Sequence, residues 1–205
     1  MTYDLNYVVL ASIFLFGYFL GSIPFGLILT KISGLGDIRN IGSGNVGATN
    51  VLRTGNKLIA FLVLCLDIFK GFVPFLILKF YFNDVSLLNK IIICHFAVIG
   101  HIFPIWLKFK GGKGVATYIG FLLGTNPYIS ISFLIVWFIV AIITKYSSLS
   151  SLIAIFVAPL FFIFINFNFY IVIFFIYLSM IIYLKHSENL KRLLNKTESK
   201  IKLFK

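Results

Sequence analysis

The sequence predicts an all-α integral membrane protein. Of its 205 residues, 60% are hydrophobic and only 12% are charged, and the mean hydropathy is +1.03. Soluble domains contain about 45–50% apolar and about 25% charged residues, and a core of this size could not bury the excess. Long runs without charge then show where the chain crosses the bilayer as helices.

The first three predicted spans follow from such runs. Residues 5–30 carry no charge and are too long for a signal peptide, so we expect a retained first helix across a hydrocarbon core of about 30 Å. Residues 58–78 form a second span, interrupted by Asp67 and Lys70, and residues 91–107 form a third. Because charge inside a bilayer is expensive unless paired, we expect Asp67 and Lys70 to form an ion pair.

Two further runs are too long for one helix each. Residues 114–144 number 31 and would extend roughly 46 Å, and Asn126-Pro127 near their middle favours a break. Residues 146–184 number 39 and would extend roughly 58 Å, with a turn expected at Asn166-Phe167-Asn168. The prediction is therefore seven transmembrane helices in a single membrane-embedded domain, residues 1–205.

The distribution of basic residues predicts the orientation, because lysine and arginine collect in cytoplasmic loops. With seven spans and the N-terminus outside, fifteen of the eighteen basic residues lie inside and the C-terminus is cytoplasmic. Treating residues 114–144 as one pass would leave seven inside against ten outside. The net charge of +12 thus reflects orientation, and we expect no nucleic-acid partner.

Polar residues concentrate in three segments that this topology places on the cytoplasmic side. They are residues 42–50 (Gly-Ser-Gly-Asn-Val-Gly-Ala-Thr-Asn), residues 110–114 (Lys-Gly-Gly-Lys-Gly) and residues 185–192 (Lys-His-Ser-Glu-Asn-Leu-Lys-Arg). The outside loops are poorer in polar groups. We therefore expect a catalytic or binding site that opens to the cytoplasm at the membrane boundary.

Residues 110–114 have the composition of an anion-binding turn. Gly111, Gly112 and Gly114 let backbone N–H groups converge, and a helix predicted to begin at Val115 adds its N-terminus beside Lys113. The segment is not a P-loop, because Lys113 is followed by glycine. The alternative is a basic turn that only flanks the membrane.

Residues 42–50 offer side-chain donors and acceptors on a glycine-rich frame. These come from Ser43, Asn45, Thr49 and Asn50, and Arg53 follows one turn on if a short helix begins there. Such a segment can wrap a small polar ligand, or it can be a flexible loop capped by serine and asparagine.

His186 lies at the predicted end of the last span, and it shares a face with Asn189 if that helix continues. The pair is a candidate for acid–base chemistry or phosphate binding, whereas a lone histidine here would be a surface residue. His95 and His101 are weaker candidates.

Two further features have structural interpretations. Residues 21–26 (Gly-Ser-Ile-Pro-Phe-Gly) end the first helix with small residues that allow close packing. Cys65 and Cys94 lie in apolar runs without metal-ligand spacing, so we expect them to be packing residues. No ligand set for a metal is evident, and we expect neither a metal nor a cofactor.

Taken together, the polar segments resemble the motifs of a known family. Residues 43–50, residues 100–104 (Gly-His-Ile-Phe-Pro) with 109–116 (Phe-Lys-Gly-Gly-Lys-Gly-Val-Ala), and residues 185–194 resemble the three motifs of bacterial acyl-phosphate:glycerol-3-phosphate acyltransferases, the PlsY family. The resemblance runs in order over nearly the whole chain.

The resemblance implies a multi-pass enzyme of the bacterial inner membrane. Such an enzyme transfers a fatty acyl group from acyl phosphate to the sn-1 hydroxyl of sn-glycerol 3-phosphate, giving lysophosphatidic acid and phosphate in the first step of phospholipid biosynthesis. It also implies functional coupling to the phosphate acyltransferase that makes acyl phosphate. No histidine in the sequence begins the His-x4-Asp pattern of thioester-dependent acyltransferases.

An acyl phosphate is an activated anhydride, so positioning and charge stabilisation can supply most of the rate. The expected donor ligands are Ser43, Lys113 and the turn glycines Gly111, Gly112 and Gly114. The expected acceptor ligands are Thr49, Asn50, Arg53 and Arg192, and Asn45 is also expected to bind substrate. His186 and Asn189 are expected to orient the attacking hydroxyl or the phosphate, and a phosphate oxygen of the donor takes the proton.

Two other functions fit parts of the sequence. A small transporter for a phosphorylated solute could use the same basic glycine turns, but it would need polar lining on the outside half and shows no internal repeat. A purely structural membrane subunit would leave the three polar segments unexplained.

Overall fold

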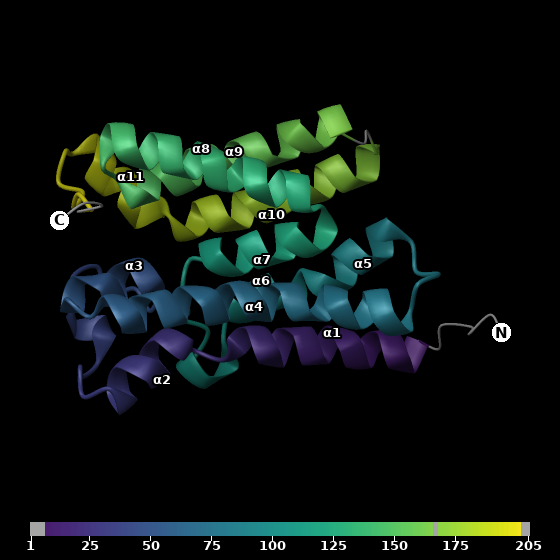
Figure 1. Cartoon of the computed structure of the whole chain (residues 1–205), viewed down its shortest axis with the longest axis horizontal. Coiled ribbons are helices and arrows are strands. Elements are labelled where there is room, and N and C mark those ends of the chain that lie inside the picture. The colour runs from purple at the N-terminus through teal and green to yellow at the C-terminus, as the bar shows by residue number, and fades with distance from the viewer. Residues whose placement is uncertain (1–6, 166–167, 202–205) are drawn as a thin grey trace. The chain divides into compact units, whose positions relative to one another are not determined.

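The computed structural model describes residues 7–165 and 168–201, and within these ranges the chain is helical with no β-strand (Figure 1). It forms two compact units, Met1–Thr125 and Asn126–Lys205, which are described separately.

The first unit is built around α4. Its α-helices are α1 (Tyr7–Ser22), α2 (Phe25–Ile32), α3 (Ala48–Val51), α4 (Lys57–Tyr81), α5 (Leu87–Cys94), α6 (Phe96–Ile102) and α7 (Val115–Thr125). Three short 3-10 helices join them: η1 (Ile38–Asn40), η2 (Leu52–Thr54) and η3 (Ile105–Leu107). Helix α4 contacts all six of the other α-helices of this unit, and in Figure 1 it runs alongside α1 and α7.

The second unit is a bundle of α8 (Pro127–Thr144), α9 (Ser147–Ile165), α10 (Phe169–Lys185) and α11 (Ser187–Leu194). Helix α9 contacts each of the other three.

Both long charge-free runs break as the sequence predicts. Asn126 accepts a hydrogen bond from the backbone N–H of Tyr128 (2.9 Å) and so caps α8, whose first residue is Pro127. Asn168 caps α10 by accepting from the N–H of Ile171 (3.2 Å). The other two residues of the predicted turn, 166 and 167, lie outside the described residues.

The first charge-free run, residues 5–30, is not one continuous helix, and it breaks within residues 21–26. Helix α1 ends at Ser22 and α2 begins at Phe25, with a bend of 41°. Pro24 lies in the break, where its ring and missing N–H disfavour a continuous helix.

The described residues contain four helical segments long and apolar enough to span a membrane: α4, residues 87–107, α8 and α9. The count rises to six if the bent pairs α1–α2 and α10–α11 each form one span, and α7 is a shorter apolar helix of 11 residues. These helices make the chain a multi-pass membrane protein.

Glycines bring the helices of the first unit into backbone contact. A Cβ atom on Gly71 of α4 would lie 2.1 Å from the carbonyl oxygen of Thr117, and one on Gly120 of α7 would lie 1.9 Å from that of Ile68. Only glycine permits this approach, and small residues are the usual means of close packing between membrane helices.

The same holds for residues 21–26, whose predicted packing role is confirmed. A Cβ atom on Gly21 would lie 2.1 Å from the carbonyl oxygen of Ala97 on α6, and one on Gly26 would lie 1.8 Å from that of Val46. The second contact matters for the site, because it seats α2 directly on the polar segment 42–50.

Candidate active site

Residues 42–50, here called the Asn50 loop, are organised by one buried amide. Asn50 is 1% exposed, and its Nδ2 lies 2.9–3.0 Å from the carbonyl oxygens of Ile38, Ile41 and Asn45. Its Oδ1 accepts from the N–H of Ser43 at 3.1 Å. The loop is therefore a fixed structure, and not the flexible connection that was the alternative.

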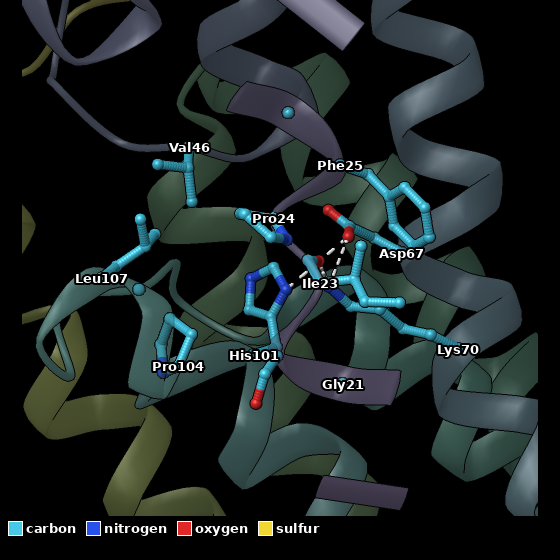
Figure 2. A pocket seen from close by; sticks show the side chains of 13 residues that line it. Gly21, Ile23, Pro24, Phe25, Val46, Asp67, Lys70, His101, Pro104 and Leu107 are labelled. Carbon is cyan, nitrogen blue, oxygen red and sulfur yellow. Dashed lines mark hydrogen bonds and ion pairs between the residues drawn. The ribbon is translucent and has the colours of Figure 1, made fainter. Parts of the chain in front are cut away.

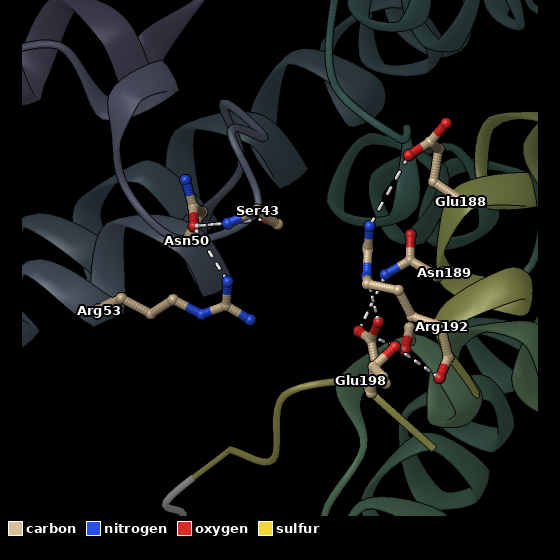
Figure 3. Close-up of polar contacts among 9 residues, drawn as sticks. Ser43, Asn50, Arg53, Glu188, Asn189, Arg192 and Glu198 are labelled. Carbon is tan, nitrogen blue, oxygen red and sulfur yellow. Dashed lines mark hydrogen bonds and ion pairs between the residues drawn. The ribbon is translucent and has the colours of Figure 1, made fainter. Parts of the chain in front are cut away.

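Asn50 was predicted to bind substrate directly, but its amide is occupied by the loop itself. In the structure this amide positions the neighbouring residues of the loop. It holds Ser43, whose hydroxyl is 3.4 Å from Oδ1, and Arg53, whose Nη1 is also 3.4 Å from Oδ1 (Figure 3). Unlike Asn50, the side chains of Ser43, Thr49 and Arg53 are exposed.

Two glycines allow this geometry. Gly42 has φ +56° and Gly44 has φ +69°, in the left-handed region that glycine adopts readily. A Cβ atom on Gly42 would also lie 2.6 Å from Nη1 of Arg53. The predicted short helix is present as α3 followed by η2, and it places Arg53 one turn beyond the loop.

Residues 110–114, here called the glycine turn, also need their glycines. A Cβ atom on Gly111 would lie 2.2 Å from the carbonyl oxygen of His101, and one on Gly112 would lie 2.2 Å from Nε2 of the same residue. Gly114 has φ +86°. Helix α7 begins at Val115 as predicted, so the half-buried Lys113 precedes a helix N-terminus.

A pocket in the first unit is lined by both polar segments (Figure 2). Val46 comes from the Asn50 loop and Gly111 from the glycine turn, while the break between α1 and α2 contributes residues 21–26. Three ionisable side chains also line it: Asp67, Lys70 and His101. The sequence interpretation assigned residues 21–26 and the charged pair to structure alone, and it did not predict that they share a pocket.

The predicted ion pair between Asp67 and Lys70 is confirmed. Lys70 Nζ lies 2.8 Å from Asp67 Oδ1, and the two side chains are 1% and 2% exposed. Lys70 also donates to the carbonyl oxygen of Ile23 at 2.9 Å. Since Ile23 lies in the break between α1 and α2, the ion pair fixes that break.

His101 extends the pair to the glycine turn. Its Nδ1 is 3.7 Å from Asp67 Oδ1, and the opposite edge of its ring packs against Gly112. The backbone joins as well, because Gly112 donates its N–H to the carbonyl of His101 at 3.1 Å. One buried cluster therefore holds both segments, through Ile23 and α2 on one side and His101 on the other.

In the second unit, His186 and Asn189 are both buried, at 2% exposure each. The last helix does not continue without a break, which was the condition for a shared face: α10 ends at Lys185 and α11 begins at Ser187, with a bend of 62°. His186 Nδ1 lies 2.8 Å from the carbonyl oxygen of Ile182. A carbonyl only accepts, so Nδ1 carries the proton and Nε2 of the neutral ring is the acceptor nitrogen.

Glu198, which the sequence interpretation missed, accepts hydrogen bonds from three side chains of this unit (Figure 3). Its Oε1 accepts from Asn189 Nδ2 at 2.9 Å and from Ser148 Oγ at 3.0 Å, and its Oε2 accepts from Arg192 Nε at 2.7 Å. Burial raises the pKa of Glu198, but the hydrogen bonds from Arg192, Asn189 and Ser148 outweigh it and hold the pKa below its ordinary value.

Arg192 was predicted to bind the anionic acceptor, and it already has carboxylate neighbours within its own unit. Besides Glu198, the exposed Glu188 lies 3.9 Å from Nη1. No group of three or more His, Cys, Asp and Glu side chains with a metal-binding arrangement occurs in the described residues.

The fold defines a multi-pass membrane protein with polar clusters at its helix ends, and the comparisons identify its class. A family model for glycerol-3-phosphate acyltransferase matches residues 11–196. Relatives named glycerol-3-phosphate acyltransferase include one from Bartonella quintana (strain Toulouse), 52% identical over 193 residues that cover 93% of this chain and 90% of that protein. Another, from Pelagibacter ubique (strain HTCC1062), is 49% identical over 201 residues that cover 98% of this chain and 100% of that protein.

Solved structures agree. The crystal structure of PlsY (YgiH), an integral membrane glycerol 3-phosphate acyltransferase, in its glycerol 3-phosphate form, has a TM-score of 0.87 at 37% identity and covers 94% of this chain and 96% of that one. Its lysophosphatidic acid form has a TM-score of 0.85 at 35% identity. The chain belongs to the glycerol-3-phosphate acyltransferase family and is an acyltransferase.

Replacing Lys70 by methionine tests the buried cluster. Lys70→Met leaves the Asp67 carboxylate buried without its cation, which we expect to destabilise the protein by about 3–5 kcal/mol. The double variant Asp67→Leu/Lys70→Met removes both charges and should recover most of that loss. Thermal unfolding in detergent measures both effects, and equal melting temperatures for the single variant and wild type would contradict the assignment.

Proposed function

We propose that the protein transfers a fatty acyl group from acyl phosphate to the sn-1 hydroxyl of sn-glycerol 3-phosphate. The products are 1-acyl-sn-glycerol 3-phosphate, which is lysophosphatidic acid, and inorganic phosphate. The family supports the acceptor and the product. The observation that most supports a phosphorylated donor is the glycine turn, where Lys113 precedes the N-terminus of α7 and close packing on His101 excludes side chains at Gly111 and Gly112.

In this mechanism Lys113, Ser43 and the N–H groups from Gly114 into the start of α7 bind the phosphate of the donor. Gly111 and Gly112 shape the turn, because their own N–H groups already donate to the carbonyl oxygens of Ile102 and His101. Backbone N–H groups and a cation stabilise the charge that develops on the carbonyl and on the leaving phosphate. Since phosphate is a stable leaving group, no covalent enzyme intermediate is required.

The acceptor is held by its own phosphate. Thr49 on the Asn50 loop and Arg53 in η2, which are both exposed, bind that phosphate, Asn45 is a further ligand, and Asn50 fixes the loop. Arg192 is a further proposed ligand of the acceptor, on account of its positive charge. A fixed acceptor turns the reaction into an effectively intramolecular one.

Asn189 orients the attacking hydroxyl. Its Oδ1 is buried and has no hydrogen-bond partner, so it is an acceptor available to a hydroxyl donor. His186 lies beside it in the chain with Nε2 as acceptor nitrogen. The proton leaves to a phosphate oxygen of the donor as the hydroxyl oxygen attacks the acyl carbon and the bond from that carbon to the phosphate oxygen breaks.

We further propose a topology of seven spans in a single domain over residues 1–205, with the N-terminus outside and the C-terminus in the cytoplasm. Six spans come from the long helices and bent pairs, and α7 is the seventh. The basic residues support this orientation. The location is the bacterial inner membrane, where the reaction is the first step of phospholipid synthesis and is coupled to the enzyme that makes acyl phosphate.

Product formation by the purified protein in detergent tests the donor. We expect lysophosphatidic acid and phosphate from palmitoyl phosphate plus glycerol 3-phosphate, and no product when palmitoyl-CoA replaces palmitoyl phosphate. Turnover in detergent also excludes a transporter, which needs sealed compartments. Acylation from palmitoyl-CoA alone would overturn the proposed donor.

Lys113→Ala should reduce the rate of transfer by about a hundredfold or more, because it removes the cation at the donor phosphate. Lys110→Ala is the matched control, since it removes an exposed lysine from the same turn. Steady-state rates with unfolding temperatures measure both variants. Activity of a folded Lys113→Ala protein within a few-fold of wild type would contradict the assignment.

A further inference from the structure

The C-terminal segment after α11 places one carboxylate among the polar groups of the second unit. Glu198 lies beyond the helix end at Leu194, and its side chain is only 6% exposed. It accepts hydrogen bonds from Ser148 on α9 and from Asn189 and Arg192 on α11.

The chemistry of these contacts fixes which way the Asn189 amide points. An ionised carboxylate only accepts hydrogen bonds, and Glu198 is ionised at neutral pH because its pKa is lowered. The amide must therefore turn its NH₂ group toward Glu198, and Nδ2 lies 2.9 Å from Oε1. Its carbonyl oxygen is left as the buried acceptor without a partner.

We infer that Glu198 is a positioning residue for acyl transfer: it holds Asn189 with its oxygen directed away from Glu198, where that oxygen accepts a hydrogen bond from the attacking hydroxyl of the acceptor. This rests on the proposed function. An amide turned the other way would offer an NH₂ group instead, which cannot accept from a hydroxyl. Glu198 thus acts through Asn189 and touches no substrate.

The variant Glu198→Gln reverses the arrangement with little change of shape. The strongest donor nearby is the charged Arg192, so the glutamine oxygen should take its N–H. The glutamine NH₂ then faces Asn189, whose oxygen must turn toward it. The expected result is a kcat lower by about tenfold to a hundredfold, the effect of losing one hydrogen bond to a site group, with the KM for acyl phosphate unchanged.

A second substitution should restore the acceptor. Asn189→Asp alone sets two carboxylates against each other and should lose more activity than Glu198→Gln. In the double variant Asn189→Asp/Glu198→Gln, the glutamine NH₂ donates to one aspartate oxygen and the other oxygen is again an outward acceptor. We expect the double variant to exceed Asn189→Asp in kcat by about tenfold or more. Ser148→Ala, which leaves the Asn189 and Arg192 contacts intact, should stay within about threefold of wild type.

Steady-state kinetics with palmitoyl phosphate and glycerol 3-phosphate test this inference. The unfolding temperature of each variant is measured as well. A folded Glu198→Gln protein with wild-type kcat, or a double variant no more active than Asn189→Asp, would overturn the inference. A structural tail anchor would lower the unfolding temperature of Glu198→Gln without any rescue. An inactive wild type would instead refute the proposed function, and the inference with it, so the two failures are distinguishable.

Discussion

The position of the first unit's polar segments depends on one buried ion pair. Burying Asp67 and Lys70 costs desolvation energy that hydrophobic packing alone would not require. Their geometry explains why the pair is useful: Lys70 holds the carbonyl of Ile23 in the break between α1 and α2, and Asp67 faces His101, whose ring lies against Gly112. Gly26 of α2 in turn packs closely against Val46 of the Asn50 loop. Both segments are therefore positioned from the same helix, α4.

In the second unit, too, a buried charge positions neighbouring groups, and here more of those groups are polar side chains. A single carboxylate, Glu198, connects side chains from α9 and α11 and restricts the orientation of an amide. In each unit a buried charge also fixes an uncharged group: the carbonyl of Ile23 in the first unit and the amide of Asn189 in the second. This arrangement suits a reaction with an activated donor, because such a reaction gains most from positioning and from preorganised hydrogen-bond donors.

Local signals in the sequence predicted much of this structure. Asn126-Pro127 and Asn168 are cap residues whose effect depends only on their neighbours, and they end or begin helices as expected. Asp67 and Lys70 are three residues apart on one helix, so their pairing was also a local property. The contact of His101 with Gly112 and the hydrogen bond between Glu198 and Asn189 depend on tertiary packing. The spacing of residues along a helix does not predict contacts that lie beyond the end of that helix. For the same reason, the sequence placed Asn50 among the ligands when its amide is used inside the loop.

Hydrogen–deuterium exchange on the double variant Asp67→Leu/Lys70→Met tests most directly whether the buried pair positions both segments. This variant removes the charges without leaving one unpaired, so α4 and α7 should keep their protection. The account predicts faster exchange in residues 42–50 and in residues 110–114 together, since both depend on the pair. Wild-type protection in both segments would contradict it and would show that helix packing alone holds them.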